Sequence, residues 1–281
     1  TGGDIYIGIV GPVRTGKSTF IKRFMDLLVI PNIKNVYDRS RATDELPLSG
    51  AGRTITTTEP KFVPNEAVEM TVGENITLRI RLVDCVGYAV EGALGYEDGG
   101  ALRRVITPWF ATEMSFQEAA EIGTRKVITE HSTIGLVVTT DGSITEIPRG
   151  NYVAAEERVI TELRELGKPF LVILNSVHPH HPETQNLAEV LQEKYGLPVL
   201  PIDCAQMGHG EIELIFKELL SMFPLREINI DFPKWVEALE PGHWLRLRFE
   251  ETIREAISPV QRMRDLDAAF AYLRAQDFIQ A

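Results

Sequence analysis

A short stretch near the start of the chain has the residue types and the spacing that bind phosphate. Residues 11–18 read GPVRTGKS, which matches the pattern G-x-x-x-x-G-K-[ST]. In such a loop the backbone N–H groups surround the phosphates, glycines permit that close approach, and the N-terminus of the following helix adds partial positive charge. We expect Lys17 to reach the β- and γ-phosphates and Ser18 to bind Mg²⁺. The spacing therefore predicts a site for a nucleoside triphosphate.

A carboxylate that could bind the same cation ends the segment IRLVD. Asp84 closes an apolar run typical of a buried strand, and Gly87 follows three residues later. The pair resembles the Walker B and D-x-x-G element of GTPase-like proteins, in which the aspartate holds Mg²⁺ through a water and the glycine N–H senses the γ-phosphate. A strand-end aspartate that only caps a turn is the plainer alternative. The phosphate-binding pattern at residues 11–18 favours the metal site.

Threonines between these two motifs are candidates for the rest of the metal shell. The segment GRTITTTEP, residues 52–60, has four threonines in five consecutive positions. A loop threonine in this place resembles the switch threonine of the same class, which completes the coordination of Mg²⁺. We favour Thr57 and Thr58 as catalytic residues, with Thr58 as a metal ligand. A solvated segment leading into a strand has the same composition and is the alternative.

A further polar group follows the apolar run FLVIL and could read the base. GTPases of this layout carry N-K-x-D there, and the aspartate accepts from the N1–H and the amino group of guanine. This chain reads Asn175-Ser176-Val177-His178 instead. A buried donor pair without an acceptor costs a few kcal/mol (about 1–3 per group), so we expect guanine preference to be lost and ATP to be the nucleotide.

The position after D-x-x-G often carries a glutamine that orients the attacking water, and here it is Tyr88. We therefore expect slow hydrolysis, with the threonines of residues 52–60 as the nearest other groups. Arg14 could touch the phosphates, although a lone loop arginine is more often solvated. The expected nucleotide contacts are Gly11, Arg14, Thr15, Gly16, Lys17, Ser18, Thr19, Gly87 and Asn175.

Alternating strand and helix patterns over the first two hundred residues supply the elements that position these groups. Short apolar runs such as GLVVTT and FLVILN suit strands buried on both faces, and helical periodicity separates them. We predict an α/β fold, a P-loop NTPase of the GTPase-like (TRAFAC) type, with a mainly parallel sheet and helices on both faces. The segments AVEMTVG (67–73) and ITLRIRLVDCVG (76–87) read as the two strands of a hairpin, and residues 87–115 as a long Gly-rich loop. We place the P-loop domain at 1–223 and the start of a second, mostly helical module at 224–281.

Bulk properties exclude several other classes. The 281 residues carry a net charge of −11, so the basic surface that nucleic acid requires is missing. The two cysteines lie far apart and predict neither a disulfide framework nor a zinc site, which fits a reducing compartment. The run HPHHP at 178–182 lacks carboxylates at ligand spacing and reads as a surface loop. The chain begins at Thr1 almost within a strand pattern, and we expect residues to precede it.

Taken together, several segments resemble the family of stage IV sporulation protein A, the spore-coat morphogenetic ATPases of endospore-forming bacteria. They include IGIVGPVRTGKSTF, ELPLSGAGRTITTTEPKFVPNEA, RLVDCVGYAVEGALGYED, EAAEIGTRKVITEHSTIG, TTDGSI and KPFLVILNSVHPHHPET. The resemblance covers essentially the whole chain. It implies that Lys17 is the Walker A lysine, Asp84 the Walker B aspartate, and Thr57 and Thr58 the sensor threonines.

The same resemblance carries expectations about biology. It implies an ATPase that descends from translation-factor-like GTPases and hydrolyses ATP, with Mg²⁺, to assemble into a static homopolymer, the basement layer of the spore coat. It places the protein in the mother-cell cytoplasm, peripherally on the outer forespore membrane. A small amphipathic membrane peptide would recruit it through a C-terminal region beyond this chain, and other coat proteins would dock on it.

Three other functions compete with this interpretation. A GTPase molecular switch with a protein partner requires guanine preference, which the residues at 175–178 disfavour. A P-loop small-molecule kinase requires an acceptor pocket and lid arginines, to which nothing in the motifs points. A binding-only scaffold does not need an intact Lys17, Ser18 and Asp84.

Overall fold

The computed structural model of the chain describes residues 4–33, 36–44, 46, 61–72, 76–98, 101–107 and 110–278. The chain forms two compact units, residues 1–218 and 219–281. The predicted nucleotide-binding motifs all fall in the first unit.

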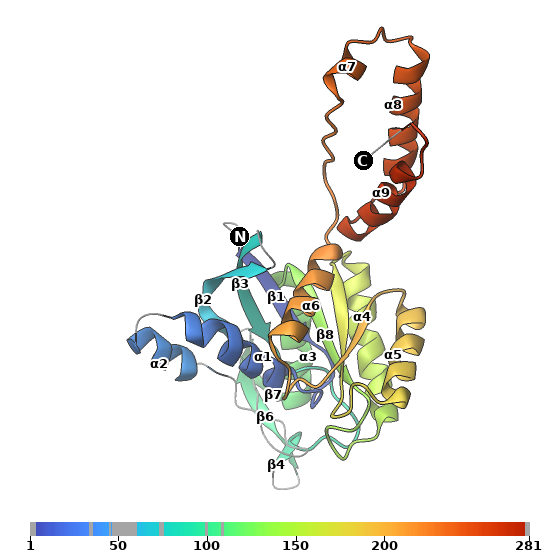
Figure 1. Cartoon of the computed structure of the whole chain (residues 1–281). Helices are drawn as coiled ribbons and strands as arrows, with labels where there is room; N and C mark the ends of the chain where they lie inside the picture. The colour runs from blue at the N-terminus through green and yellow to red at the C-terminus, as the bar shows by residue number, and fades with distance from the viewer. Residues whose placement is uncertain are drawn as a thin grey trace. The chain divides into compact units, whose positions relative to one another are not determined.

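A six-stranded sheet organises the first unit (Figure 1). Its strands lie in the order β10-β9-β8-β1-β3-β2; all neighbours run parallel except β2, which is antiparallel to β3. The strands are β1 (Asp4–Val10), β2 (Lys61–Val72), β3 (Ile76–Asp84), β8 (Ile134–Thr140), β9 (Phe170–Asn175) and β10 (Val199–Ile202). Both the mainly parallel sheet and the hairpin of β2 and β3 are confirmed.

Helices lie on both sides of this sheet in Figure 1. They are α1 (Lys17–Phe24), α3 (Phe116–Lys126), α4 (Val153–Glu165), α5 (Pro182–Tyr195) and α6 (His209–Ser221). Phe24 of α1 packs against Phe216 of α6, with ring centroids 5.8 Å apart. Arg158 of α4 forms an ion pair with Glu121 of α3 at 3.0 Å. The predicted α/β architecture of a GTPase-like P-loop protein is therefore confirmed.

Strands β8 and β9 are buried along their whole length, as their apolar runs predict. The parallel registers pair Ile9 with Asp84 and Thr140 with Asn175. The carboxyl ends of four strands consequently meet at one edge of the sheet, and the loops that follow them carry the polar residues of the site.

Two segments differ from the sequence predictions. Residues 87–115 were expected to form one long loop, but they contain two small antiparallel pairs: β4 (Glu97–Asp98) with β5 (Ala101–Leu102), and β6 (Arg104–Thr107) with β7 (Phe110–Ser115). The β-branched residues of RVIT (104–107) supply strand propensity that the glycines nearby obscure. Helix α2 (Val36–Asp44) lies where the sequence has no clear period.

The helix that follows the phosphate loop changes geometry along its length. After α1 it continues as a π-helical turn (Met25–Val29) and a 3₁₀ turn (Ile30–Asn32). Pro31 within the last turn has no backbone N–H to continue the helix. Helix α3 likewise continues as a π-helical turn (Val127–His131), and a 3₁₀ turn (Arg149–Tyr152) leads into α4.

The regular elements that follow α6 in the second unit are helical in its described part. It contains α7 (Lys234–Glu237), α8 (Trp244–Ile257), a 3₁₀ turn (Met263–Asp265) and α9 (Leu266–Arg274). The described part of this unit contains an isolated β-bridge between Pro224 and Arg262. Val236 is fully buried, and Phe249 meets the ring of Phe278 edge-on.

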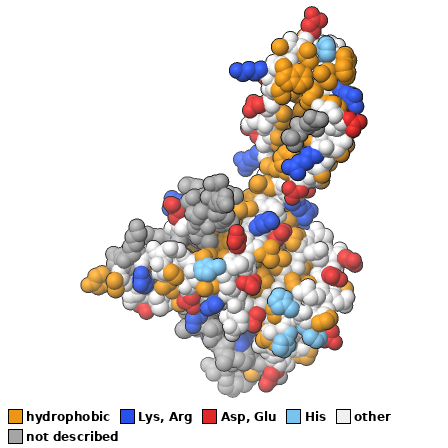
Figure 2. Space-filling view, in the orientation of Figure 1, with side chains coloured by type: hydrophobic (Ala, Val, Ile, Leu, Met, Phe, Trp, Pro, Cys, Tyr) orange, Lys and Arg blue, Asp and Glu red, His pale blue; other side chains and the backbone are white. Residues whose placement is uncertain are grey.

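Several large apolar side chains of this second unit face solvent, and Figure 2 shows hydrophobic groups gathered on its visible surface. Among them are Trp235, Trp244, Leu247, Phe270 and Tyr272. Within the described parts of the chain, no helix has both the length and the apolar character needed to span a bilayer.

Candidate functional site

The phosphate-binding loop between β1 and α1 requires glycine at two positions. Gly11 has φ +141°, and a Cβ there would lie 2.3 Å from the carbonyl oxygen of Val138. Gly16 has φ +92° and is the N-cap of α1. A residue with a side chain is strained at such φ values, and a Cβ at Gly11 would also collide with the backbone of Val138. The local conformation therefore leaves the first turn of α1 open to an anion, as the motif predicts.

Lys17 lies inside this loop. Its side chain is buried, and Nζ donates to the carbonyl oxygens of Pro12 at 2.5 Å and Gly11 at 3.4 Å. Burial lowers the pKa of Lys17, while the neighbouring Cys85 and Asp84 act to raise it. The ammonium is therefore held where the loop surrounds a phosphate, and a phosphate oxygen would replace carbonyl oxygens as its acceptor.

The other residues of the loop that were predicted to contact the nucleotide are Thr15, Thr19 and Arg14, and they differ in burial. Thr15 is fully buried, and its hydroxyl donates to the carbonyl oxygen of Pro12 at 3.0 Å. Thr19 is partly exposed on the first turn of α1. Arg14 has φ +63° and is half-buried; burial lowers its pKa, and Tyr152 opposes that shift. Arg14 is therefore partly enclosed by the protein instead of standing free in solvent.

Asp84 and Ser18 come together at the carboxyl end of β3. The Ser18 hydroxyl donates to Asp84 Oδ2 at 3.3 Å. Asp84 is fully buried, and its Oδ1 has no hydrogen-bond partner among the described residues. Burial raises the pKa of Asp84 to about 6, against the opposing effect of Lys17.

A buried carboxylate oxygen without a partner, beside a serine hydroxyl, fits a divalent cation that prefers oxygen ligands. Mg²⁺ takes one or two protein oxygens and completes its shell with phosphate oxygens and waters. Ser18 and Asp84 are the described residues that would hold it. The predicted catalytic residues Thr57 and Thr58, with Thr58 as the third predicted metal ligand, lie outside the described residues.

Gly87 approaches the loop closely. Its φ is +99°, and a Cβ there would lie 2.5 Å from both the Gly11 carbonyl oxygen and Lys17 Nζ. Its N–H, predicted to sense the γ-phosphate, donates to the hydroxyl of Thr124 on α3 at 3.0 Å. The same hydroxyl interacts with Cys85, whose thiol pKa burial raises to about 11. Thr124 is a site residue that no sequence motif indicated.

Tyr88 points away from the phosphate site. Its backbone N–H donates to Gly11 and its carbonyl accepts from Val13, which ties this turn to the loop. The buried phenol donates to Glu162 of α4 at 2.5 Å, and the guanidinium of Arg158 covers its ring at 4.0 Å. Burial, and then Glu162, raise the pKa of Tyr88 well above its usual range. Tyr88 therefore anchors α4 and has no part in orienting water.

Asn175 braces the site at the end of β9. Its Nδ2 donates to the carbonyl oxygen of Thr15 at 2.9 Å, and its Oδ1 accepts from the N–H of Cys204 at 3.0 Å. A Cβ at Gly16 would lie 2.2 Å from Nδ2. Both ends of the amide are thus engaged in joining the phosphate loop to the loop after β10. Asn175 lies beside the site as predicted, and positioning is the role that its contacts support.

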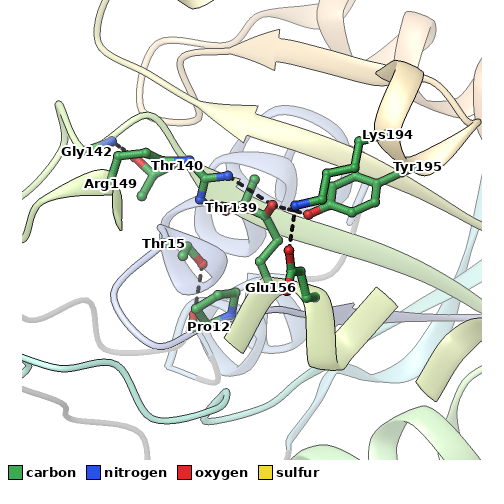
Figure 3. A network of polar contacts seen from close by, with 10 residues as sticks. Pro12, Thr15, Thr139, Thr140, Gly142, Arg149, Glu156, Lys194 and Tyr195 are labelled. Carbon is green, nitrogen blue, oxygen red and sulfur yellow. Dashed lines mark hydrogen bonds and ion pairs between the residues drawn. The ribbon is translucent and has the colours of Figure 1, made fainter. Parts of the chain in front are cut away.

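A buried polar network supports the loop after β8. Figure 3 shows Thr139, Arg149 and Tyr195 converging on Glu156, with Thr15 and Pro12 of the phosphate loop in the same view. Glu156 is fully buried and forms an ion pair with Arg149 at 2.8 Å; it accepts hydrogen bonds from Thr139 and, at 2.6 Å, from Tyr195. The network joins β8, α4 and α5, and through Arg149 it holds the last part of the segment 141–152.

The histidine-rich run at 178–182 has a structural use. The ring of His181 accepts from the backbone N–H of Glu183 at the start of α5. In the described part of the chain, no cluster of three or more His, Cys, Asp or Glu side chains could hold a metal ion. The expectation of a surface loop is consistent with this arrangement.

Family models match the whole chain in two parts. One described as the ATPase domain of stage IV sporulation protein A matches residues 1–224, and one described as the middle domain of that protein matches residues 225–281. Relatives named stage IV sporulation protein A are 54% identical over 279 residues in Bacillus anthracis and 53% identical over 281 residues in Bacillus subtilis (strain 168). One in Clostridioides difficile (strain 630) is 52% identical over 280 residues.

These alignments cover 99% or 100% of this chain and 57% of each relative, so the chain spans little more than half of their length. Among solved structures, one described as a probable GTP-binding protein engB is 17% identical, with a TM-score of 0.42. That likeness covers 76% of this chain and 97% of the other. It is too distant to bear on the base or the reaction.

Proposed function

The chain belongs to the stage IV sporulation protein A family, and we propose that its ATPase domain drives self-assembly of the whole protein. The assembly would be a polymer that forms the basement layer of the spore coat on the forespore surface. ATP hydrolysis would lock each subunit into its assembled conformation, so a slow single turnover per subunit would suffice.

The observation that carries the enzymatic part is the buried Asp84 Oδ1 beside Ser18 and Lys17. A buried carboxylate oxygen without a partner is costly unless a ligand satisfies it. Mg²⁺, when bound, supplies positive charge that neutralises the phosphates. Lys17 would hold the β- and γ-phosphates, Ser18 and Asp84 would position the cation, and Gly87 would donate its N–H to the γ-phosphate.

Slow hydrolysis is supported by the orientation of Tyr88. A side chain fixed against α4 leaves the position after D-x-x-G without a group to orient water. Thr57 and Thr58 remain our proposed catalytic residues for that task. The Gly87 N–H must also leave Thr124 before it can meet a phosphate, and this couples nucleotide binding to α3.

Base preference is proposed from the residues at 175–178. His178 takes the place where an aspartate would accept the two donors of guanine, and its backbone N–H bonds to Ser176. ATP is therefore the proposed substrate.

The partners are proposed from family membership. They are other copies of the protein, a small amphipathic membrane-anchoring peptide and other coat proteins, with peripheral association at the outer forespore membrane in the mother-cell cytoplasm. The exposed aromatic side chains of the second unit support a role in protein contacts. The net charge of −11 supports the exclusion of nucleic acid.

The test measures turnover of ATP and GTP, and nucleotide-dependent sedimentation, with the full-length protein. Lys17→Ala should lose nucleotide binding, and the double variant Thr57→Ala/Thr58→Ala should bind ATP without hydrolysing it. Lys22→Ala, on the exposed face of α1, is the matched control and should behave as wild type. Equal or better turnover of GTP would replace this proposal with a GTPase molecular switch. Turnover of ATP without sedimentation would separate the ATPase from assembly.

A further inference from the structure

The sheet topology determines on which side of the phosphate loop the nucleoside lies. Asp84 follows β3, on one side of β1, whereas β8, β9 and β10 lie on the other side. A nucleotide whose terminal phosphates meet Asp84 and Lys17 therefore extends its nucleoside toward the carboxyl ends of β8, β9 and β10. The contact of Asn175 with the Thr15 carbonyl shows that these ends reach the loop.

On the three loops at those strand ends, side-chain oxygens accept hydrogen bonds from six backbone N–H groups. After β8, Gly142 donates to Thr140 Oγ1 at 3.0 Å and Ser143 donates to Asp141 Oδ1 at 2.9 Å. The other four bonds are Val177 N–H to Ser143 Oγ, His178 N–H to Ser176 Oγ, and the Ala205 and Gln206 N–H groups to Asp203 Oδ1. Five side chains thus cap six donors, and the edge that they form presents mainly acceptors.

This polarity distinguishes the purines at their 6-position. Guanine carries an acceptor oxygen at position 6, whereas adenine carries an amino group that donates. A site built for one partner rejects the other because a buried polar group is left unpaired. Capped donors leave the guanine oxygen without a partner, while hydroxyl and carboxylate oxygens suit the adenine amino group.

Asp203 is the capping residue on the loop after β10, which Asn175 joins to the phosphate loop. It follows β10 directly, and Cys204, the next residue, donates its N–H to Asn175. The Ala205 N–H comes next on the same turn and bonds to Asp203 Oδ1 at 2.9 Å. The Gln206 N–H also bonds to the Asp203 carbonyl oxygen, so Ala205 is the donor that depends on the carboxylate.

On the basis of the proposed ATP site, we propose that Asp203 is a specificity-determining residue that selects a 6-amino purine over a 6-oxo purine. Its carboxylate caps the Ala205 N–H, which would otherwise be a free donor available to a 6-oxo group. An ionised carboxylate has about four acceptor positions. Its remaining positions are available to the amino group of adenine.

Other caps are less separable from the fold. Ser176 is fully buried and bonds to His178 and Ser143, and Ser143 also bonds to Asp141 and Val177. Replacing either serine would disturb two loops at once. Asp203 is only partly buried, and the hydrogen bonds of its carboxylate stay within its own turn, so a substitution there tests the base without moving the neighbouring loops.

The experiment measures affinities by calorimetry, with the full-length protein, for ATP, GTP and two analogues that separate the base positions. Inosine triphosphate has the 6-oxo group without the 2-amino group, and 2-aminoadenosine triphosphate has both amino groups. Wild type should bind 2-aminoadenosine triphosphate within a few-fold of ATP. It should bind inosine triphosphate and GTP at least roughly tenfold more weakly, the factor that about one ordinary hydrogen bond contributes.

Two variants separate capping from charge. Asp203→Ala frees the Ala205 N–H, so affinity for inosine triphosphate and GTP should rise roughly tenfold relative to ATP. Asp203→Asn keeps an oxygen that can cap the same N–H, and its preference should stay near that of wild type. An unchanged ratio of ATP to inosine triphosphate in Asp203→Ala would overturn the inference, as would rejection of 2-aminoadenosine triphosphate by wild type.

Failure of the proposed function has a different signature. If wild type bound no nucleotide, or bound nucleotides equally well after Lys17→Ala, the P-loop site itself would be excluded and this inference with it. If binding depended on Lys17 and favoured ATP, while Asp203→Ala changed no ratio, only the role of Asp203 would be lost.

Discussion

Replacing Asp84 with asparagine should stabilise the first unit in the absence of Mg²⁺, although it removes a residue that we assign to the site. Asp84 is fully buried, and its Oδ1 has no partner in the described part of the chain. Burial raises its pKa from 3.8 to about 6. An ionised Asp84 therefore opposes folding, and a neutral amide of the same shape does not.

The magnitude follows from proton linkage. A tenfold change in a proton equilibrium is worth about 1.4 kcal/mol, so a carboxyl with a pKa of about 6 when folded and about 4 when unfolded costs about 3 kcal/mol once ionised. Because the folded pKa is the higher one, wild type has its full stability below about pH 4. It loses that contribution as the pH rises through about 6.

The assay is hydrogen exchange of the amides in β1 and β3, followed by mass spectrometry across pH 4 to 8 with a chelator present. These amides report on opening of the first unit alone. Asp84→Asn should match wild type near pH 4 and exceed it by about 3 kcal/mol above pH 7. Asp26→Asn, an exposed position in the same unit, is the control and should show no such divergence.

Magnesium and ATP should reverse the order. Ligand that binds only the folded state stabilises it by mass action, and wild type should gain this stabilisation while Asp84→Asn gains much less. A stability difference that does not vary between pH 4 and 8 would refute the reasoning. So would a less stable Asp84→Asn at pH 8 without metal.

Three further substitutions test contacts around the site. Thr124→Val should lower the free energy of urea unfolding by about 1–3 kcal/mol because the Gly87 N–H loses its acceptor. The same substitution should raise the affinity for ATP relative to ADP, and Thr124→Ser should restore both values. Glu156→Gln should lower stability by about 3–5 kcal/mol in urea unfolding because the buried partner of Arg149 loses its charge, and a smaller combined loss with Arg149→Met would confirm the pairing. Gly87→Ala should lower the free energy of unfolding by about 1–3 kcal/mol because of its positive φ, and it should abolish ATP binding in calorimetry. A Gly87→Ala variant with wild-type affinity would contradict the close approach to Lys17.

The sequence was sufficient to predict the phosphate loop and the sheet, because both follow from local rules. The spacing of Gly11, Gly16 and Lys17 dictates a backbone conformation, and alternating apolar runs and helices dictate a parallel sheet. The same logic placed Asp84 at a strand end next to that loop. The structure has each of these features where the pattern put them.

Contacts between distant segments could not be predicted in the same way. The meeting of Thr124 with Gly87 depends on how α3 packs against the sheet, 37 residues along the chain. The direction of the Tyr88 side chain depends on Glu162 of α4 in the same sense. The small hairpins within 87–115 were missed because their strands are only two to six residues long, too short for a periodic signal.

The capped backbone groups at the ends of β8, β9 and β10 have a consequence for evolutionary change. A mutation at Asp203 uncovers one donor, but the position of His178 still has no carboxylate for the other edge of guanine. A mutation that places a carboxylate at position 178 leaves the Ala205 N–H capped by Asp203. Neither step alone gives a good guanine site, so a change to GTP requires two coordinated substitutions through an intermediate that reads both bases poorly. Such a protein would therefore keep an adenine preference unless both substitutions arose together.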